Sequence, residues 1–288
     1  MATKVKAQPK KDVKKPKASA KTSEKGLKIK PAKLKEPILK GNPSDSRSTF
    51  FRTLRSEGIR EDIIEAFENV EPALFFDARN HTVFYTSQPV QIAHGQTGDV
   101  FLNLARMINH LNPKKGQVIL EIGTGSGYST AILSLLCKEV ITVDIVEELA
   151  VAAKKRLYDN DFGNIRFYAG DGTDLENEYG KIDGAIIHAA CRKRPLALLE
   201  QMTPGGVAVY PMGPAHMHQI TVMTNREDLV KGERFAMKFY EQGHFSLIEG
   251  IFGYKESEGA NPWGEEGEED PPKAIDSNPF LFQPPQED

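Results

Sequence analysis

Hydrophobic positions in the middle of the chain follow two periods, one typical of helices and one of strands. From Ser48 to Phe67 and from Val100 to Leu111, apolar residues recur three or four positions apart, which predicts helices around an irregular segment, 73–98. Beyond them, short apolar runs alternate with helical segments. Strands are expected at Val118–Ile122, Val140–Val143, Ile165–Tyr168, Ile182 with Ala185–Ile187, Val207–Val209, Ile220–Met223 and Phe245–Phe252, and helices at Tyr128–Leu136, Glu147–Tyr158 and Pro195–Met202.

This alternation of strands and helices predicts the fold class. Consecutive parallel strands joined through a helix make right-handed crossovers, so we expect an α/β fold with a doubly wound, mostly parallel sheet. Sheets of this kind bind ligands beyond the carboxyl ends of their strands, at the point where the strand order reverses. The residues that follow the predicted strands are therefore the first candidates for chemistry.

The two ends of the chain differ from the middle in charge. Residues 1–40 hold 14 lysines against three acids, whereas residues 256–288 hold ten acids against one lysine. Both ends are rich in proline and poor in large apolar side chains, so they cannot bury enough surface to offset their chain entropy. We predict disordered tails over 1–46 and 256–288 around a folded domain at 47–255.

Composition also narrows the class and the location of the protein. The sequence has no run of 18 apolar residues and no secretory signal pattern, so we expect no membrane span and a cytoplasmic protein. Its two cysteines, Cys137 and Cys191, lack metal-ligand spacing, and no metal site is expected. The lysine-rich arm, residues 1–40, would suit weak contact with a polyanion, or it is a solubilising tail.

The strongest chemical signal follows the first predicted strand. Glu121 is followed by Gly123, Thr124, Gly125 and Gly127 in the pattern Gly-x-Gly-x-Gly, directly before a helix. Glycines there permit a tight turn and a close approach of the backbone to a ligand, and the helix start offers free N–H groups. Such a loop alone is weak evidence, since several nucleotide-binding folds use similar turns. The acid before it suits a cationic amino group better than a pyrophosphate.

Two further acids end the next predicted strands. Asp144 closes the second strand, where a carboxylate can accept both hydroxyls of a ribose, and Asp171 with Gly172 follows the third, within reach of an adenine amine. Each acid by itself is equally well explained as a helix cap. Together, with no basic residue among them, the three acids fit an adenosyl ligand that lacks phosphate.

Several stretches resemble the protein-L-isoaspartate O-methyltransferase family, a group of Rossmann-like class I methyltransferases. The resemblance covers about half of the chain, in the order and nearly the spacing of the family. The matching pieces are Ala93–Thr97, Ala105–Met107, Val118–Tyr128, Gly170–Gly172, Asp183 with Ala189 and Ala190, and Gln201–Gly206 continuing to Pro211–Gly213. The glycine loop is shared by many methyltransferases, whereas the His-Gly-Gln-Thr segment, 94–97, is specific to this family.

The resemblance implies an activity and a set of site residues. The family transfers a methyl group from S-adenosyl-L-methionine to the free carboxylate of isoaspartyl residues in damaged proteins, a repair reaction. It implies that Glu121, Gly123, Thr124, Gly125 and Gly127 lie at the cofactor, that Asp144 binds its ribose and that Asp171 and Gly172 bind its adenine. Thr97 would lie at the methyl-transfer end. The acceptor is already ionised, so positioning is expected to dominate catalysis.

One position departs from the family pattern. Asp99 stands where the family has a serine that helps to hold the substrate carboxylate, and at about 4 Å an ionised aspartate would repel that carboxylate by several kcal/mol. Either Asp99 is tolerated, turned aside at Gly98, or it is a general base for a neutral acceptor. The alternatives are thus a hydroxyl, amine or other carboxylate acceptor, or a cofactor-binding scaffold. His188, after the fourth strand, is expected to be a satisfied, partly buried histidine.

Overall fold

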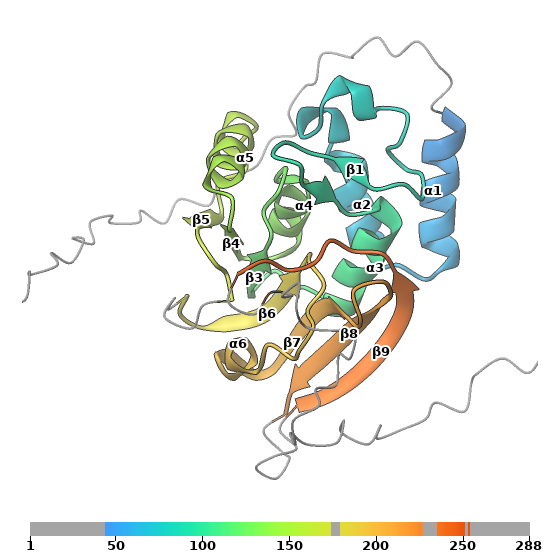
Figure 1. Cartoon of the computed structure of the whole chain (residues 1–288). Helices are drawn as coiled ribbons and strands as arrows, with labels where there is room; N and C mark the ends of the chain where they lie inside the picture. The colour runs from blue at the N-terminus through green and yellow to red at the C-terminus, as the bar shows by residue number, and fades with distance from the viewer. Residues whose placement is uncertain (1–43, 174–178, 227–234, 251–252, 254–288) are drawn as a thin grey trace, which may run out of the picture. The chain divides into compact units, whose positions relative to one another are not determined.

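Helices open the part of the chain that the computed structural model describes, residues 44–173, 179–226, 235–250 and 253 (Figure 1). The helical spacing in the sequence is confirmed, and the first helix begins at Ser44, three residues before the predicted domain boundary. Gly58, with φ of +72°, separates the first two helices. The elements of this part are α1 (Ser44–Ser56), α2 (Glu61–Asn69), the 3-10 turns η1 (Pro72–Leu74) and η2 (Ala78–Asn80), the short strands β1 (Val90–Gln91) and β2 (Thr97–Gly98), and α3 (Phe101–Leu111).

The main sheet has seven strands in the order β5-β4-β3-β6-β7-β8-β9. Neighbouring strands from β5 to β7 pair in parallel, whereas β8 pairs antiparallel with both β7 and β9. This arrangement confirms the predicted mostly parallel α/β fold. The strands are β3 (Val118–Ile122), β4 (Glu139–Asp144), β5 (Ile165–Ala169), β6 (Ile182–Ile187), β7 (Met202–Met212), β8 (His218–Asn225) and β9 (Phe235–Gly243), and the helices between them are α4 (Tyr128–Leu136), α5 (Glu147–Asp159) and α6 (Leu196–Glu200).

The strand predicted at Phe245–Phe252 is wrong, as far as the structure describes that segment. The last strand is instead β9, an edge strand with exposed Phe239 and Tyr240, and its side chains lack the alternation of a half-buried strand. After β9 the chain crosses the carboxyl ends of the parallel strands. There the Ala190 N–H donates to the Ser246 carbonyl at 2.7 Å, and the Ile248 N–H donates to the Ala190 carbonyl at 3.1 Å.

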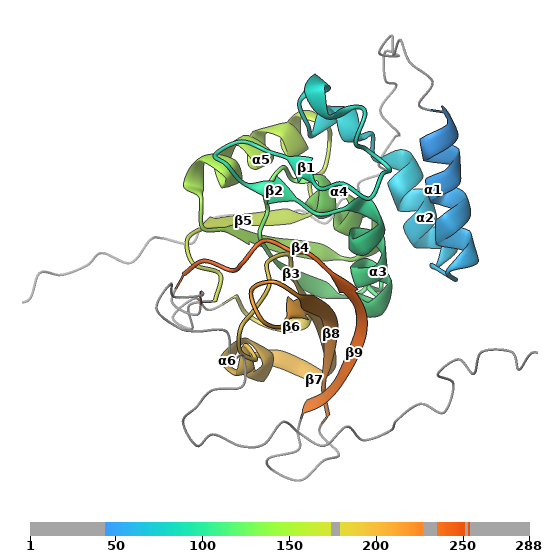
Figure 2. The same cartoon turned by 45° about the vertical axis from the view of Figure 1, so that its right-hand side comes forward.

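Successive strand residues point to opposite sides of the sheet, so both of its faces carry apolar side chains and both are covered by helices. Ile119 of β3 packs into the apolar cluster under α1 to α5, whereas Leu120 packs into the cluster under α6. Figure 2 shows the β1–β2 hairpin and the segment after β9 at the same end of the sheet. The strand order reverses at β3, which has β4 on one side and β6 on the other, and ligands bind such sheets at the carboxyl ends of these strands. The predicted tails lie outside the described residues, apart from the first residues of α1.

Gly127 shows how closely the layers pack. It begins α4 with φ of +86°, and a Cβ there would lie 3.0 Å from Leu157 Cδ1 and 3.3 Å from Ala153 Cβ, both on α5. This is the close approach of helices that a glycine permits.

We predict that Gly127→Ala lowers the free energy of unfolding more than Gly58→Ala does. Both glycines have positive φ, so each alanine is strained by about 1–2 kcal/mol, but nothing lies within 4 Å of a Cβ at Gly58. Overpacking against α5 adds about 1–3 kcal/mol at Gly127 alone. Urea unfolding of both variants measures the difference, and equal losses would contradict this packing argument.

Candidate functional site

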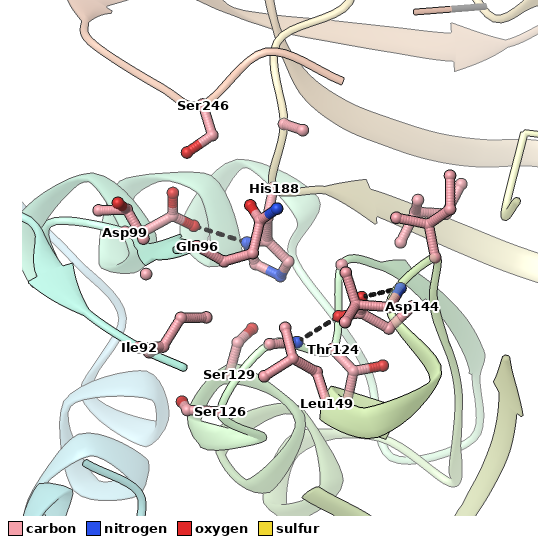
Figure 3. A pocket seen from close by; sticks show the side chains of 18 of the residues that line it. Ile92, Gln96, Asp99, Thr124, Ser126, Ser129, Asp144, Leu149, His188 and Ser246 are labelled. Carbon is pink, nitrogen blue, oxygen red and sulfur yellow. Dashed lines mark hydrogen bonds and ion pairs between the residues drawn. The ribbon is translucent and has the colours of Figure 1, made fainter. Parts of the chain in front are cut away.

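A pocket lies at the carboxyl ends of β3, β4 and β6, under the β1–β2 hairpin and the segment after β9 (Figure 3). Most of the residues that the sequence singled out line it. They are Thr97, Asp99, Gly123, Thr124, Gly125, Asp144, Asp171 and Gly172. Apolar and aromatic side chains that the sequence did not single out complete the wall, among them Phe76, Ile92, Phe101, Tyr128 and Leu149. The pocket thus combines an apolar wall with convergent polar groups, as ligand sites commonly do.

The glycine loop after β3 forms the floor of the pocket. Gly123 and Gly125 have φ of +97° and +52°, and a Cβ at these positions would lie 3.3 Å from His188 and from Ile92, respectively. The N–H of Gly123 donates to the carbonyl of Val143 at 2.8 Å, which fixes the loop to the neighbouring strand. Glycine at both positions therefore keeps the floor open for a ligand that approaches the backbone.

Asp144 closes β4 beside this loop. Its carboxylate accepts hydrogen bonds from the N–H of Gly125 at 2.7 Å and from the N–H of Val146 at 2.9 Å. Burial raises the pKa of Asp144, and these two hydrogen bonds oppose that shift. Each carboxylate oxygen has two lone pairs, so one donor at each leaves acceptor capacity for hydroxyls in the pocket.

Asp171 and Gly172 form the next part of the wall after β5. The Asp171 carboxylate accepts hydrogen bonds from the N–H of Thr173 at 2.9 Å and from its hydroxyl at 2.6 Å. A Cβ at Gly172 would lie 2.9 Å from Ile122 at the end of β3, so only glycine fits there without a shift. The loop after β5 is thereby held against β3, within the pocket.

A chain of charged groups crosses the floor toward the hairpin. His188 follows β6, and its Nδ1 lies 2.6 Å from Asp99 Oδ2 while its Nε2 lies 3.1 Å from Glu121 Oε1. The Glu121 carboxylate is fully buried and also accepts hydrogen bonds from the hydroxyls of Thr130 at 2.5 Å and Thr142 at 2.7 Å. Burial lowers the pKa of His188, but the adjacent carboxylates of Asp99 and Glu121 outweigh burial and raise it to about 10.

Two of the predicted cofactor residues lie elsewhere than expected. Glu121 does not line the pocket, because it lies on the side of β3 that faces α4 and its carboxylate is taken up by His188 and two threonines. Gly127 is also outside the pocket wall, where it allows α4 and α5 to pack. The acid before the glycine loop thus contacts a protein cation, where the sequence had indicated a ligand amine.

The wall opposite His188 comes from the segment after β9. Ser246 lines the pocket, and Figure 3 shows its hydroxyl pointing into the cavity toward Asp99 and Gln96. The amide of Gln96 donates to Glu249 Oε1 at 3.0 Å and so joins the hairpin to this segment. Sequence reasoning missed Ser246, because that segment was predicted as a strand, and it gave no functional part to His188. Its position directly after a predicted strand, where ligand sites form in such sheets, was the one signal that could have indicated a part for His188.

A doubly wound sheet, a glycine loop after its first parallel strand and acids after the next two strands are features of Rossmann-like folds, which S-adenosyl-L-methionine-dependent methyltransferases share. A profile of the protein-L-isoaspartate(D-aspartate) O-methyltransferase family matches residues 45–241. The chain belongs to this family.

Relatives agree with that assignment, and solved structures share the fold. The protein-L-isoaspartate O-methyltransferase of Nitrobacter winogradskyi is 34% identical over 201 residues, 69% of this chain and 93% of that protein. The one of Dictyoglomus thermophilum is 32% identical over 211 residues, covering 73% and 94%. A solved protein-L-isoaspartate O-methyltransferase has the same fold, with a TM-score of 0.62 at 19% identity over 72% of this chain and 67% of that chain. A Plasmodium falciparum structure described as a putative member, in complex with S-adenosyl-L-homocysteine, gives 0.56 at 18% identity, over 69% and 95%.

Among the described residues, no group of three or more histidine, cysteine, aspartate and glutamate side chains is arranged to hold a metal ion. Within the same residues, no helix is both long and apolar enough to cross a membrane.

We predict that Asp144→Ala weakens binding of S-adenosyl-L-homocysteine by about 1.5–3 kcal/mol, the range for a hydrogen bond to a charged group. The control is Glu139→Gln at the other end of the same strand, which is not among the residues lining the pocket and should leave the affinity unchanged. Isothermal titration calorimetry measures both, and thermal unfolding without ligand checks that the glycine loop survives. Unchanged affinity in Asp144→Ala would remove this residue from the ligand site.

Proposed function

We propose that the chain methylates the free carboxylate of isoaspartyl residues in damaged proteins, with S-adenosyl-L-methionine as the methyl donor. The observation that carries the proposal is that the family match, residues 45–241, contains both the floor of the pocket and its hairpin. The relatives quoted above are named for this activity.

The residues present fit the cofactor. Gly123, Thr124 and Gly125 leave the backbone open at the start of α4, and Asp144 keeps acceptor capacity for the ribose hydroxyls. Asp171 and Gly172 lie beyond β5, where the adenine is proposed to bind. The bound cofactor supplies a methyl group on a sulfonium centre, which a nucleophile takes in an in-line displacement. The task of the protein is to hold the acceptor in line and to exclude water.

The acceptor is proposed to lie on the side of the pocket that Thr97, Asp99 and Ser246 share. An isoaspartyl carboxylate is ionised at neutral pH, so no group has to remove a proton from it. Two hydroxyls, those of Thr97 and Ser246, are available as hydrogen-bond donors, and both residues line the pocket. These donors supply part of what the missing serine of the family pattern would have given.

The pairing of Asp99 bears on the alternative acceptors. One oxygen of its carboxylate, Oδ2, is 2.6 Å from His188 Nδ1, so this oxygen is engaged with the histidine although Asp99 lines the pocket. An oxygen engaged with an imidazolium is a poor partner for the proton of a hydroxyl or amine acceptor. The geometry therefore favours a tolerated aspartate over a general base, and a carboxylate acceptor over a neutral one.

We predict that the full-length protein transfers labelled methyl from S-adenosyl-L-methionine to an isoaspartyl peptide and not to the same peptide with a normal aspartyl residue. The two peptides differ only in whether the side-chain or the α-carboxyl group of that residue forms the peptide bond, so their charge and composition are matched. Counting base-labile methyl ester measures transfer. Cofactor binding with no transfer to either peptide would support a scaffold, and transfer to a hydroxyl or amine acceptor would support Asp99 as a base.

The proposal extends to the ends of the chain and to its location. We propose that residues 47–255 form the catalytic domain, that the tails over 1–46 and 256–288 are dispensable for chemistry, and that residues 1–40 contact polyanions weakly. Their 14 lysines support that contact. A cytoplasmic location is part of the proposal, since Cys137 and Cys191 are buried thiols, which suits a reducing compartment.

We predict that a chain of residues 41–256 methylates an isoaspartyl peptide as well as the full-length protein does. Binding to heparin should be measurable only in the full-length protein and should fall steeply with salt, because it releases counterions. Fluorescence anisotropy at several salt concentrations measures this binding. Loss of peptide methylation on truncation would show that the tails belong to the active site.

A further inference from the structure

His188 is bound by a carboxylate on each side of its ring. Nδ1 faces Asp99 Oδ2 at 2.6 Å, and Nε2 faces Glu121 Oε1 at 3.1 Å. A neutral imidazole has one N–H and cannot donate to both oxygens. The two contacts together therefore require the doubly protonated, positively charged ring, unless one of the carboxyl groups carries the proton.

The hydrogen bonds of Glu121 fix the orientation of the His188 ring. Glu121 is fully buried, and the hydroxyls of Thr130 and Thr142 both donate to its Oε2, which leaves Oε1 for His188. Turning the ring away would leave a buried carboxylate oxygen without a donor, which is costly. The ring thus has one orientation, and in that orientation its Nδ1 points at Asp99.

Asp99 in turn lies on the acceptor side of the pocket. Its side chain is 11% exposed, and Figure 3 shows Ser246 facing the Asp99–His188 pair across the cavity. An acceptor carboxylate between Ser246 and the Asp99–His188 pair would lie close to the negative charge of Asp99. If Asp99 were not paired with His188, its charge would repel the acceptor. The only cation bonded to Asp99 among the described residues is His188.

We propose that His188 is a positioning residue for methyl transfer, which compensates the charge of Asp99 and holds it aside so that an anionic acceptor can enter. The pair would replace, as a unit, the serine of the family pattern. This inference rests on the proposed function, because it concerns how a carboxylate acceptor is admitted.

The decisive experiment is a double-mutant cycle on full-length protein, with an isoaspartyl peptide as substrate. His188→Gln should raise KM about 10-fold or more, because Asp99 is then uncompensated. The fall in kcat should stay within about threefold, since repulsion fades as methyl transfer neutralises the acceptor. His188→Gln combined with Asp99→Ser should return KM to within about threefold of the unsubstituted protein. A double variant as poor as His188→Gln alone would overturn the proposal.

Two controls separate charge from folding. His110→Gln removes another histidine that pairs with a carboxylate, Glu241, at 3.3 Å and outside the pocket, and it should leave KM unchanged. Affinity for S-adenosyl-L-homocysteine, measured by calorimetry, should be the same within about threefold in His188→Gln and in the unsubstituted protein, because neither Asp99 nor His188 is proposed to hold the cofactor.

A pH profile tests the same charge without replacing His188. The charged groups that face the ring are Asp99 before α3, Glu121 on β3 and Asp144 on β4, all carboxylates, so the ring is the group that loses its charge at high pH. KM for the peptide should stay constant from about pH 7 to 9 and rise near pH 10. In Asp99→Ser it should stay constant throughout, and parallel profiles would overturn the proposal.

Nitrogen-15 NMR gives a reading that does not depend on methyl transfer. In the full-length protein at about pH 8.5, where a free histidine is neutral, both ring nitrogens of His188 should carry protons. A neutral ring at that pH would overturn the inference even if isoaspartyl peptides are methylated. A protonated ring in a protein that methylates no isoaspartyl peptide would instead show that the proposed function fails, and with it the part assigned to His188.

Discussion

A buried carboxylate inside the sheet governs the arrangement of the site. Glu121 has no exposed surface, and an ionised group in that place must be paired and hydrogen-bonded. Two threonine hydroxyls, from α4 and β4, and the ring of His188 meet that demand. The same ring then holds Asp99 and, through it, the loop between β2 and α3. One electrostatic requirement thus joins β3, β4, β6, α4 and the hairpin region at the edge of the pocket.

The glycine loop and Asp144 also fix one another through hydrogen bonds at the floor of the pocket. The N–H groups of the loop are divided between the Val143 carbonyl and the Asp144 carboxylate, so the loop keeps its shape through its neighbouring strand. Because Asp144 is itself buried at the strand end, the group that shapes the floor is also a group that lines the pocket. A site organised in this way is formed before the ligand arrives, which lowers the ordering cost of binding.

Local patterns predicted the elements and their order well, and they failed where a segment depends on a distant partner. The strands β3, β4 and β6 are near-continuous apolar runs, as strands buried on both faces are. The edge strand β9 has a mixed, exposed pattern, and its pairing with β8 decides its conformation. The next segment looks apolar enough for a strand, yet its hydrogen bonds to Ala190 place it across the pocket mouth, where Ser246 becomes part of the wall.

The sequence by itself determined the α/β class, the place of the glycine loop after the first parallel strand and the acids at the strand ends. Those features rest on the periodicity and turn chemistry of neighbouring residues, which the chain order records. Only the tertiary structure decided that Glu121 lies behind the floor, that Gly127 packs two helices together and that His188 joins Glu121 to Asp99. Residues 99, 121 and 188 come from separate elements, so their electrostatic coupling arises from strand order and side-chain direction, which no local pattern encodes.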